Sequence, residues 1–183
     1  MFISLTLALW LILIVYWLIA ARINSRTSFS SELFSFVKLI GSTILVYLPL
    51  LTNGILASRL YQPNIWLEIA GAVIVAVGVF LAIWARGLLG KNWSGSVVIQ
   101  NEHHLITDGP YRFVRHPIYL GGLLAMFGSC LVLGQVFGFA YSLLSTLGLA
   151  MKSRQEDALL AKQFPDEFSD YQQQVKMLLP YLY

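Results

Sequence analysis

The chain has 183 residues, of which 57% are hydrophobic and 11% are charged, and its net charge is +3. A soluble domain is roughly 25% charged, so this composition excludes an ordinary soluble protein and predicts one membrane domain over residues 1–183. The basic balance could indicate a nucleic-acid partner, but membrane topology explains the charge better, and we expect no nucleic acid. Cys130 is the only cysteine, which excludes an intrachain disulfide and a cysteine-based zinc site.

Five apolar segments predict an all-α protein that crosses a membrane about five times. They are Phe2–Ala21, Phe36–Ala57, Asn64–Ala85, Pro117–Leu133 and Val136–Ala150. A helix of about 20 apolar residues spans a bilayer. Pro49 is expected to kink the second span. The last two segments are short for full spans, and the Gly134-Gln135 pair between them predicts a tight helical hairpin. Residues 1–86 thus supply three spans, and residues 87–183 carry a polar loop, the hairpin and a tail.

The tail that starts at Met151 is predicted to be amphipathic. Its apolar residues recur every three or four positions: Leu160, Phe164, Phe168, Tyr171 and Val175. This spacing is typical of a helix with one buried face. Pro165 is expected to break this helix into two pieces.

The distribution of cations predicts the orientation in the membrane. If the N-terminus lies outside, eleven Lys and Arg residues face the cytoplasm and only Arg59 lies outside. Cytoplasmic loops of membrane proteins carry such an excess. This topology predicts that the polar loop before Pro117 and the charged tail share the cytoplasmic side and can build one site.

The polar loop concentrates residues that bind ligands. All three histidines, two arginines and two tyrosines fall within the seventeen residues from His103 to Tyr119. Pro117 suits the first turn of a helix, whose N-terminus favours an anion. A basic loop at the membrane surface is the simpler interpretation, in which Arg115 pairs with lipid phosphate. The three histidines show no metal-ligand spacing, and we expect no metal.

The loop and the tail together resemble one family. Residues 109–121 read GPYRFVRHPIYLG, which closely resembles the Arg-His-Pro-x-Tyr-x-Gly signature of the isoprenylcysteine carboxyl methyltransferases. The tail from Glu156 to Val175 resembles the family's pattern Glu-Glu-x-x-Leu-x-x-x-Phe-Gly-x-x-Tyr-x-x-Tyr-x-x-x-Val. It departs at three positions, with Asp157 for the second Glu, Pro165 for Gly and Phe168 for the first Tyr. The resemblance covers residues 90–180.

The resemblance implies an integral-membrane enzyme that uses S-adenosylmethionine and releases S-adenosylhomocysteine. The positions that match the family's cofactor contacts are Gln100, His103, His104, Leu105, Ile106, Tyr111, His116, Pro117, Ile118, Tyr119 and Glu156. The residue types fit, since histidine, tyrosine and helix N–H groups suit the cofactor's carboxylate. A carboxylate such as Glu156 suits its ammonium group, and an apolar wall suits its adenine.

Methyl transfer to a carboxylate needs positioning rather than acid–base catalysis, because the nucleophile is already ionised near neutral pH. Arg115 and Glu156 are the expected positioning residues. The family places an arginine four residues before the first glutamate to hold the acceptor. This chain has Lys152 there and Arg154 two positions later, and both are predicted to bind the substrate. Lysine lacks the bidentate fork of arginine.

Several functions stay open at this point. The leading one is methylation of a lipidic or prenylated acceptor, most simply an isoprenylcysteine-like carboxylate. The second is N-methylation of a phospholipid amine. A third is a nicotinamide-dependent reductase related to the membrane sterol reductases, although those are longer proteins. A scaffold without activity would leave the loop motif unexplained. Membrane lipids are expected partners in every case.

Overall fold

The computed structural model describes residues 1–23, 29–90 and 105–179, with the backbone alone over residues 23–36. Within these ranges the protein is all-α, as predicted. Its helices are α1 (Phe2–Ile23), α2 (Phe29–Tyr47), α3 (Ile65–Leu89), α4 (Pro117–Leu133), α5 (Val136–Gln163) and α6 (Pro165–Gln174). Three short 3-10 helices join them, namely η1 (Leu48–Leu51), η2 (Gly54–Ala57) and η4 (Gly109–Arg112).

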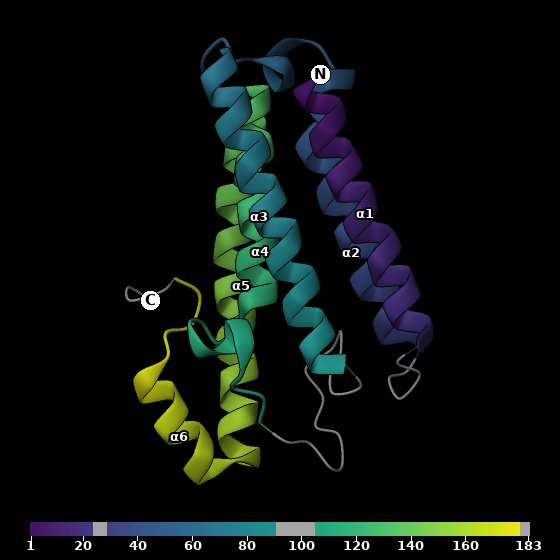
Figure 1. The fold of residues 1–183 in the computed structure, drawn as a ribbon. Helices are drawn as coiled ribbons and strands as arrows, with labels where there is room; N and C mark the ends of the chain where they lie inside the picture. Colours follow the sequence, from purple (N-terminus) through teal and green to yellow (C-terminus); the bar gives the residue numbers. More distant parts are fainter. Residues whose placement is uncertain (24–28, 91–104, 180–183) are drawn as a thin grey trace.

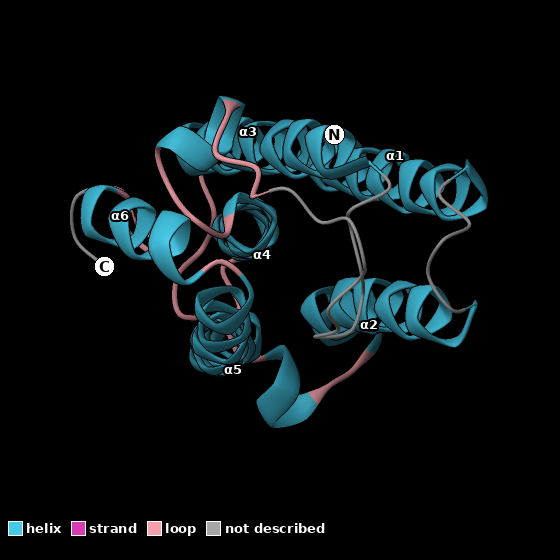
Figure 2. Cartoon of the chain, turned by 90° about the horizontal axis from the view of Figure 1, so that it is seen from below, coloured by secondary structure: helices cyan, strands magenta, loops and turns pink. Residues whose placement is uncertain are grey.

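Helices α1 to α5 run side by side along one axis (Figure 1). We call the end where α4 begins the lower end and the end where α4 turns into α5 the upper end. Seen from below, α4 lies between α3 and α5, with α1 beside α3 (Figure 2). The short helices η1 and η2 lie at the upper end, whereas η4 and α6 lie at the lower end. The polar loop and the tail therefore meet at one end of the bundle.

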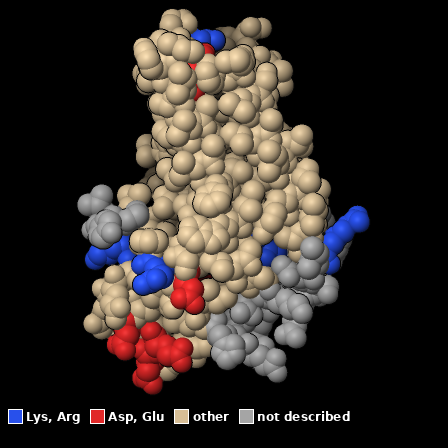
Figure 3. Space-filling model, in the orientation of Figure 1, with Lys and Arg blue, Asp and Glu red and all other residues tan. Residues whose placement is uncertain are grey.

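The surface between the two ends is apolar. Helices α1 and α3 are long and apolar enough to cross a bilayer, over Phe2–Arg22 and Ile65–Leu89. Large apolar side chains such as Leu11 and Phe80 point outward from them and are exposed. Charged side chains gather at the two ends, and an uncharged band separates them (Figure 3). The segments 37–51 and 117–133 are also apolar but shorter, so five spans remains a prediction.

Two predicted boundaries were wrong. The second span was expected to run from Phe36 to Ala57, but α2 begins at Phe29 and ends at Tyr47, and the 3-10 helices η1 and η2 follow. Pro49 ends this helix instead of kinking it, because proline has no N–H and its ring clashes with the preceding turn. Helix α5 continues past Ala150 to Gln163, because the charged and alanine-rich residues that follow are good helix formers.

Two other predictions are confirmed. Helix α4 ends at Gly134, which has a φ of +66°, and α5 begins two residues later as a tight hairpin. A Cβ at Gly134 would lie 2.7 Å from the carbonyl oxygen of Tyr61, so glycine is required there for both backbone and space. The predicted break also lies at Pro165, where α6 begins.

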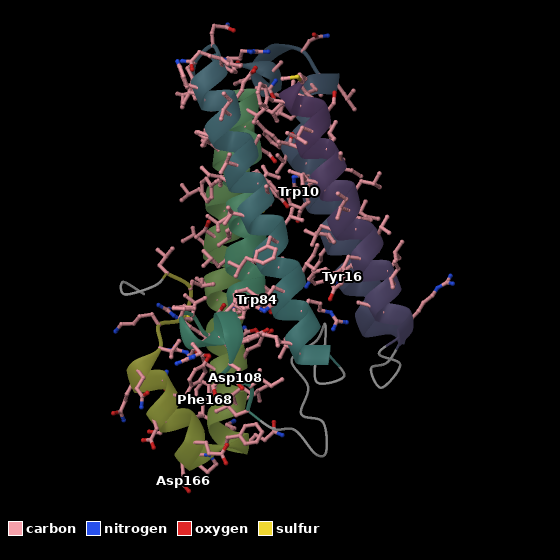
Figure 4. The ribbon with its side chains drawn as sticks, viewed as in Figure 1. Trp10, Tyr16, Trp84, Asp108, Asp166 and Phe168 are labelled. Atoms are coloured by element: carbon pink, nitrogen blue, oxygen red, sulfur yellow. The ribbon has the colours of Figure 1, made fainter. Side chains whose placement is uncertain are left out.

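A small polar network ties α1 and α2 to α4 inside the apolar core. The Trp10 indole N–H donates to the Ser129 hydroxyl at 3.0 Å, and the Tyr47 hydroxyl donates to Thr6 at 2.7 Å. Tyr47 also lies 3.1 Å from Ser129. Trp10 projects from α1 toward α3 and α4 (Figure 4). Hydrophobic contacts alone select poorly among the possible packing faces of apolar helices. Hydrogen bonds of this kind determine which faces pack against each other.

Helices α3 and α4 approach most closely through two pairs of glycines. Gly71 faces Gly128, and Gly78 faces Gly121 one heptad further along. A Cβ at Gly71 or at Gly78 would lie 2.5 Å from the carbonyl oxygen of its opposite glycine. Small residues let helix backbones approach in this way. The Gly78–Gly121 pair holds the first turns of α4 against the middle of α3, and the Gly71–Gly128 pair continues the contact toward the upper end.

Gly121 and Gly122 provide a matched test of this contact. A Cβ at Gly121 would lie 2.6 Å from the carbonyl oxygen of Gly78, whereas a Cβ at Gly122 would meet nothing within 4 Å. We expect Gly121→Ala to destabilise the protein by about 1–3 kcal/mol through overpacking. Gly122→Ala should be neutral or stabilise by up to about 1 kcal/mol. Thermal unfolding in detergent measures both, and equal melting temperatures would contradict the proposed contact.

Candidate functional site

The polar loop is attached to the lower end of α3. Gly109 has a φ of +60°, and a Cβ there would overlap the end of the Leu88 side chain. Glycine therefore allows the loop to turn directly against α3. Tyr111, two residues later, is buried, and its hydroxyl donates to the carbonyl oxygen of Ala85 at 3.3 Å. Its own carbonyl accepts a 2.7 Å hydrogen bond from the Tyr171 hydroxyl of α6.

The chain after α6 runs alongside the loop. The backbone N–H of Arg115 donates to the carbonyl of Lys176 at 2.9 Å, and that of His116 donates to the carbonyl of Met177 at 3.1 Å. Val114 and Lys176 form a parallel β-bridge. These bonds bring together the two motifs that lie far apart in the sequence.

An apolar cluster packs α6 against α5 and the loop. Phe168, Tyr171 and Val175 are buried in it. The residues packed against them are Leu105, Leu160 and Phe164. Phe168 lies between α6 and α5 (Figure 4). The amphipathic face predicted for the tail is therefore confirmed, and it is the face that covers the loop.

Asp157 of α5 binds both residues of the Arg-His pair. Its Oδ2 lies 2.7 Å from Nη2 of Arg115, and its Oδ1 lies 2.9 Å from Nε2 of His116. The three side chains are only 7–8% exposed. Arg115 also donates to the carbonyl oxygen of Val175. We call Asp157, Arg115 and His116 the Asp157 group.

The charges in this group stabilise one another. Burial by itself would raise the pKa of Asp157, but hydrogen bonds from His116 and Arg115 outweigh it, and the pKa is lowered. Burial by itself would lower the pKa of His116, but its bonds to Asp157 and Glu156 outweigh it, and the pKa is raised. The folded protein therefore favours an imidazolium between two carboxylates.

Glu156 collects a second set of side chains on the neighbouring position of α5. The Tyr119 hydroxyl donates to its Oε1 at 2.5 Å, Lys152 Nζ lies 3.6 Å from the same oxygen, and His116 Nδ1 lies 3.4 Å from Oε2. The His116 and Tyr119 rings are stacked with centroids 5.5 Å apart. Lys152 Nζ lies 5.1 Å from the centroid of the Tyr119 ring. We call these four residues the Glu156 group.

The Glu156 group combines a carboxylate with an aromatic surface. Burial alone would raise the pKa of Glu156, but hydrogen bonds from His116 and Tyr119 and the charge of Lys152 lower it. Glu156 is therefore an anion at neutral pH. An anion beside a tyrosine ring can receive a cationic ligand group. Lys152 can in turn attract an anionic one.

The structure brings together only part of the predicted site. His116, Tyr119, Glu156 and Lys152 meet in the Glu156 group. Pro117 is buried at the first position of α4, and Ile118 packs partly buried against the main core. Three predicted cofactor contacts lie outside the described residues: Gln100, His103 and His104.

The remaining predicted residues lie outside the Glu156 group. Leu105 and Ile106 are half-buried in the loop, and Leu105 belongs to the cluster around Phe168. Arg154 lies two residues before Glu156, which on a helix means the opposite side. It lines a pocket together with Asp157 and Ala158. Lys152 and Arg154, which were both predicted to bind the substrate, therefore project from different sides of α5.

Asp157 is the residue that sequence reasoning missed. It was noted only as a replacement for the family's second glutamate. A usable signal existed, because two adjacent cationic side chains at the start of an apolar helix need an anionic partner when they are buried. The family pattern did not show which carboxylate would be the anionic partner of Arg115 and His116.

The site can now be compared with known proteins. A family model described as phospholipid methyltransferase matches residues 66–167, which is more than half of the chain. The chain belongs to the phospholipid methyltransferase family. The matched region contains α3, α4, α5 and both groups at the lower end.

Curated relatives confirm the resemblance to isoprenylcysteine carboxyl methyltransferases. The chain is 30% identical over 122 residues to protein-S-isoprenylcysteine O-methyltransferase of Homo sapiens, which covers 64% of this chain and 42% of the relative. It is 29% identical over 109 residues to the Schizosaccharomyces pombe protein of the same name, covering 58% and 46%. The chain therefore spans less than half the length of these relatives.

A solved structure shows the same fold. It is that of a eukaryotic intramembrane Ras methyltransferase, isoprenylcysteine carboxyl methyltransferase, with a TM-score of 0.62 and 25% identity. The match covers 80% of this chain and 52% of the other. Together with the uncharged band in Figure 3, this likeness supports a polytopic membrane protein.

Asp157→Asn tests the role of the Asp157 group. Losing the carboxylate leaves Arg115 buried without its anion, and we expect a loss of about 3 kcal/mol in unfolding free energy. The pKa of Asp157 is lowered in the folded state, so its contribution is present above the unfolded pKa of about 3.9 and is lost as the pH falls through the folded value. Asp157→Asn has no carboxylate at this position, so its unfolding free energy should not show this decrease at low pH.

Asp166→Asn is the control, since Asp166 is exposed in the first turn of α6. A surface substitution of this kind should change stability by less than about 0.5 kcal/mol. Thermal unfolding in detergent between about pH 2 and pH 7, a range that extends well below the unfolded pKa of the carboxylate, measures all three proteins. Equal unfolding curves for Asp157→Asn and Asp166→Asn would contradict a structural role for Asp157.

Proposed function

We propose that the whole chain acts as one membrane methyltransferase domain that moves the methyl group of S-adenosylmethionine to a lipidic acceptor. The observation that carries this proposal is the Glu156 group, in which Tyr119 and His116 of the loop motif meet Glu156 of the tail motif. Membership of the phospholipid methyltransferase family supports it. The same membership favours methyl transfer over nicotinamide-dependent reduction.

The described residues fit S-adenosylmethionine. The ionised Glu156 suits the ammonium or the ribose hydroxyls of this cofactor, and the Tyr119 ring beside it suits a cationic sulfonium. Leu105 and Ile106 offer an apolar wall. Tyr111 contributes indirectly, because both its hydroxyl and its carbonyl hold the loop in place. When bound, S-adenosylmethionine supplies a methyl group activated on sulfur.

The leading acceptor is a carboxylate such as that of an isoprenylcysteine. Lys152 lies beside Glu156, and its ammonium can hold an acceptor carboxylate by charge and hydrogen bonding. Its position corresponds to the family's arginine. Arg115 is engaged with Asp157 and therefore acts as a positioning residue. The geometry favours Lys152 over Arg154 for the acceptor, because Arg154 faces away from Glu156.

A phospholipid amine is the second candidate acceptor. The description of the matching family as phospholipid methyltransferase favours it. An amine must lose a proton before or during methylation, and its protonated form would be repelled by Lys152. This repulsion places the amine second to the carboxylate.

Two variants separate the roles in the Glu156 group. Glu156→Gln should weaken S-adenosylmethionine binding by about ten- to a hundredfold, since a hydrogen bond to a charged group is worth about 1.5–3 kcal/mol. Lys152→Gln should slow methylation of a prenylcysteine analogue by a similar factor while cofactor affinity stays unchanged. Lys162→Gln, an exposed charge elsewhere on α5, is the control and should alter neither.

Calorimetry in detergent measures cofactor binding, and turnover is measured with the prenylcysteine analogue and with phosphatidylethanolamine. Absence of cofactor binding by the unmutated protein would overturn the proposed function. Turnover of the amine alone, undiminished in Lys152→Gln, would replace the carboxylate acceptor with the second candidate.

We propose further that the chain has five spans, with the N-terminus outside and the lower end in the cytoplasm. Arg59 lies in the connection at the upper end, whereas the cations of the loop and the tail lie at the lower end. The positive-inside rule supports this orientation.

Cysteine labelling tests the orientation. In a Cys130→Ser background, a cysteine at Gln173 should react with a membrane-impermeant reagent only from the cytoplasmic side. One at Arg59 should react only from outside. The reverse pattern would invert the topology, and labelling of both from one side would contradict five spans.

A further inference from the structure

A basic pocket lies on the side of α5 that faces away from the Glu156 group. It has a volume of about 550 Å³ and opens between α5, α6 and the segment after α6. Arg154, Ala158 and Ala161 of α5 line one side of it, and Lys176 lines the other. The two alanines are small and exposed, so the pocket has room for a bulky group beside the cations.

The lining of this pocket is net positive. Arg115 and Asp157 form part of it, and they neutralise each other through their 2.7 Å ion pair. Arg154 and Lys176 are exposed and come from different elements, so their charges converge on the pocket from two sides. A guanidinium fork and an ammonium are the side chains that proteins use most often for phosphate.

An exposed apolar stripe on α5 leads to the pocket. It consists of Leu143, Leu144, Leu147 and Met151, whose side chains are 58–67% exposed. Arg154 and Ala158 continue the same helical face. The steps from Leu147 to Met151, to Arg154 and to Ala158 are four, three and four residues, which keeps all four side chains on one side of the helix. Leu143 and Arg154 are about 16 Å apart along the helix, which is about half the thickness of a bilayer core. The stripe thus matches one leaflet.

The position of the pocket fits a lipid head group. The charged residues of the lower end border the uncharged band of the surface (Figure 3). A phospholipid has the same layout, with acyl chains in the apolar layer and a phosphate at its edge. Because the stripe belongs to the bilayer-facing surface, a ligand with acyl chains contacts both the stripe and the cations, whereas a soluble anion contacts the cations alone.

We propose that this pocket binds the phosphate of an anionic phospholipid, with its acyl chains along the Leu143–Met151 stripe. The site is distinct from the proposed methyl-transfer site, because Lys152 and Glu156 lie on the other side of α5. Arg154 was predicted from the sequence to bind the substrate, and in this proposal it binds the phosphate of the lipid instead.

Native mass spectrometry of the full chain in detergent tests the site. The ligands are dioleoyl phosphatidylglycerol, dioleoyl phosphatidylcholine and glycerol phosphate. We expect one phosphatidylglycerol to be retained in preference to the other two. Arg154→Gln and Lys176→Gln should each weaken its binding about tenfold, as expected for losing one charged hydrogen bond. Lys162→Gln removes an equal charge outside the pocket and should leave binding unchanged.

A second variant keeps both cations. Ala161→Phe fills the pocket and should also remove the bound phosphatidylglycerol, so the test does not depend on the stability of the charge variants. Binding that is unchanged in Arg154→Gln and Ala161→Phe would overturn the site. Equally tight glycerol phosphate would overturn the lipid assignment, and equally tight phosphatidylcholine would overturn the requirement for an anionic head group.

Discussion

The buried Asp157 carboxylate is the interaction on which the rest of the lower end depends. It joins α5 to the Arg-His pair immediately before α4, and the backbone of the same pair is bound to the chain after α6. Breaking such a buried pair leaves a charge uncompensated. His116 is shared between Asp157 and Glu156, so one contact determines both the attachment of the loop and the orientation of the stacked rings.

The apolar part of the bundle positions this polar end. The glycine pairs hold α4 against α3, and Tyr111 attaches the loop to the last turns of α3. The network of Trp10, Tyr47 and Ser129 sets α1 and α2 against α4. Most hydrophobic contacts in such a bundle discriminate little between helix faces, so these few close or polar contacts specify the arrangement.

Helix α5 separates two chemically different surfaces at the lower end. Lys152 and Glu156 face Tyr119 on one side, where a cation, an anion and an aromatic ring lie together. Arg154 faces the basic pocket on the other side. The resemblance places an arginine at the position of Lys152, and lysine offers a point charge in place of the bidentate fork of arginine.

Hydrophobicity and helix-breaking residues by themselves determined the all-α fold, the Gly134 hairpin, the break at Pro165 and the buried face of α6, because these depend on local periodicity and backbone chemistry. The distribution of lysine and arginine along the chain also indicated that the loop and tail motifs would lie on one side of the membrane. Only tertiary structure decided that Asp157 binds the Arg-His pair and that Arg154 turns away from Glu156. Both depend on α5 continuing as one helix beyond Ala150. Each residue along a helix turns the side-chain direction by about 100°, so the continuous helix fixes the directions of Arg154, Glu156 and Asp157.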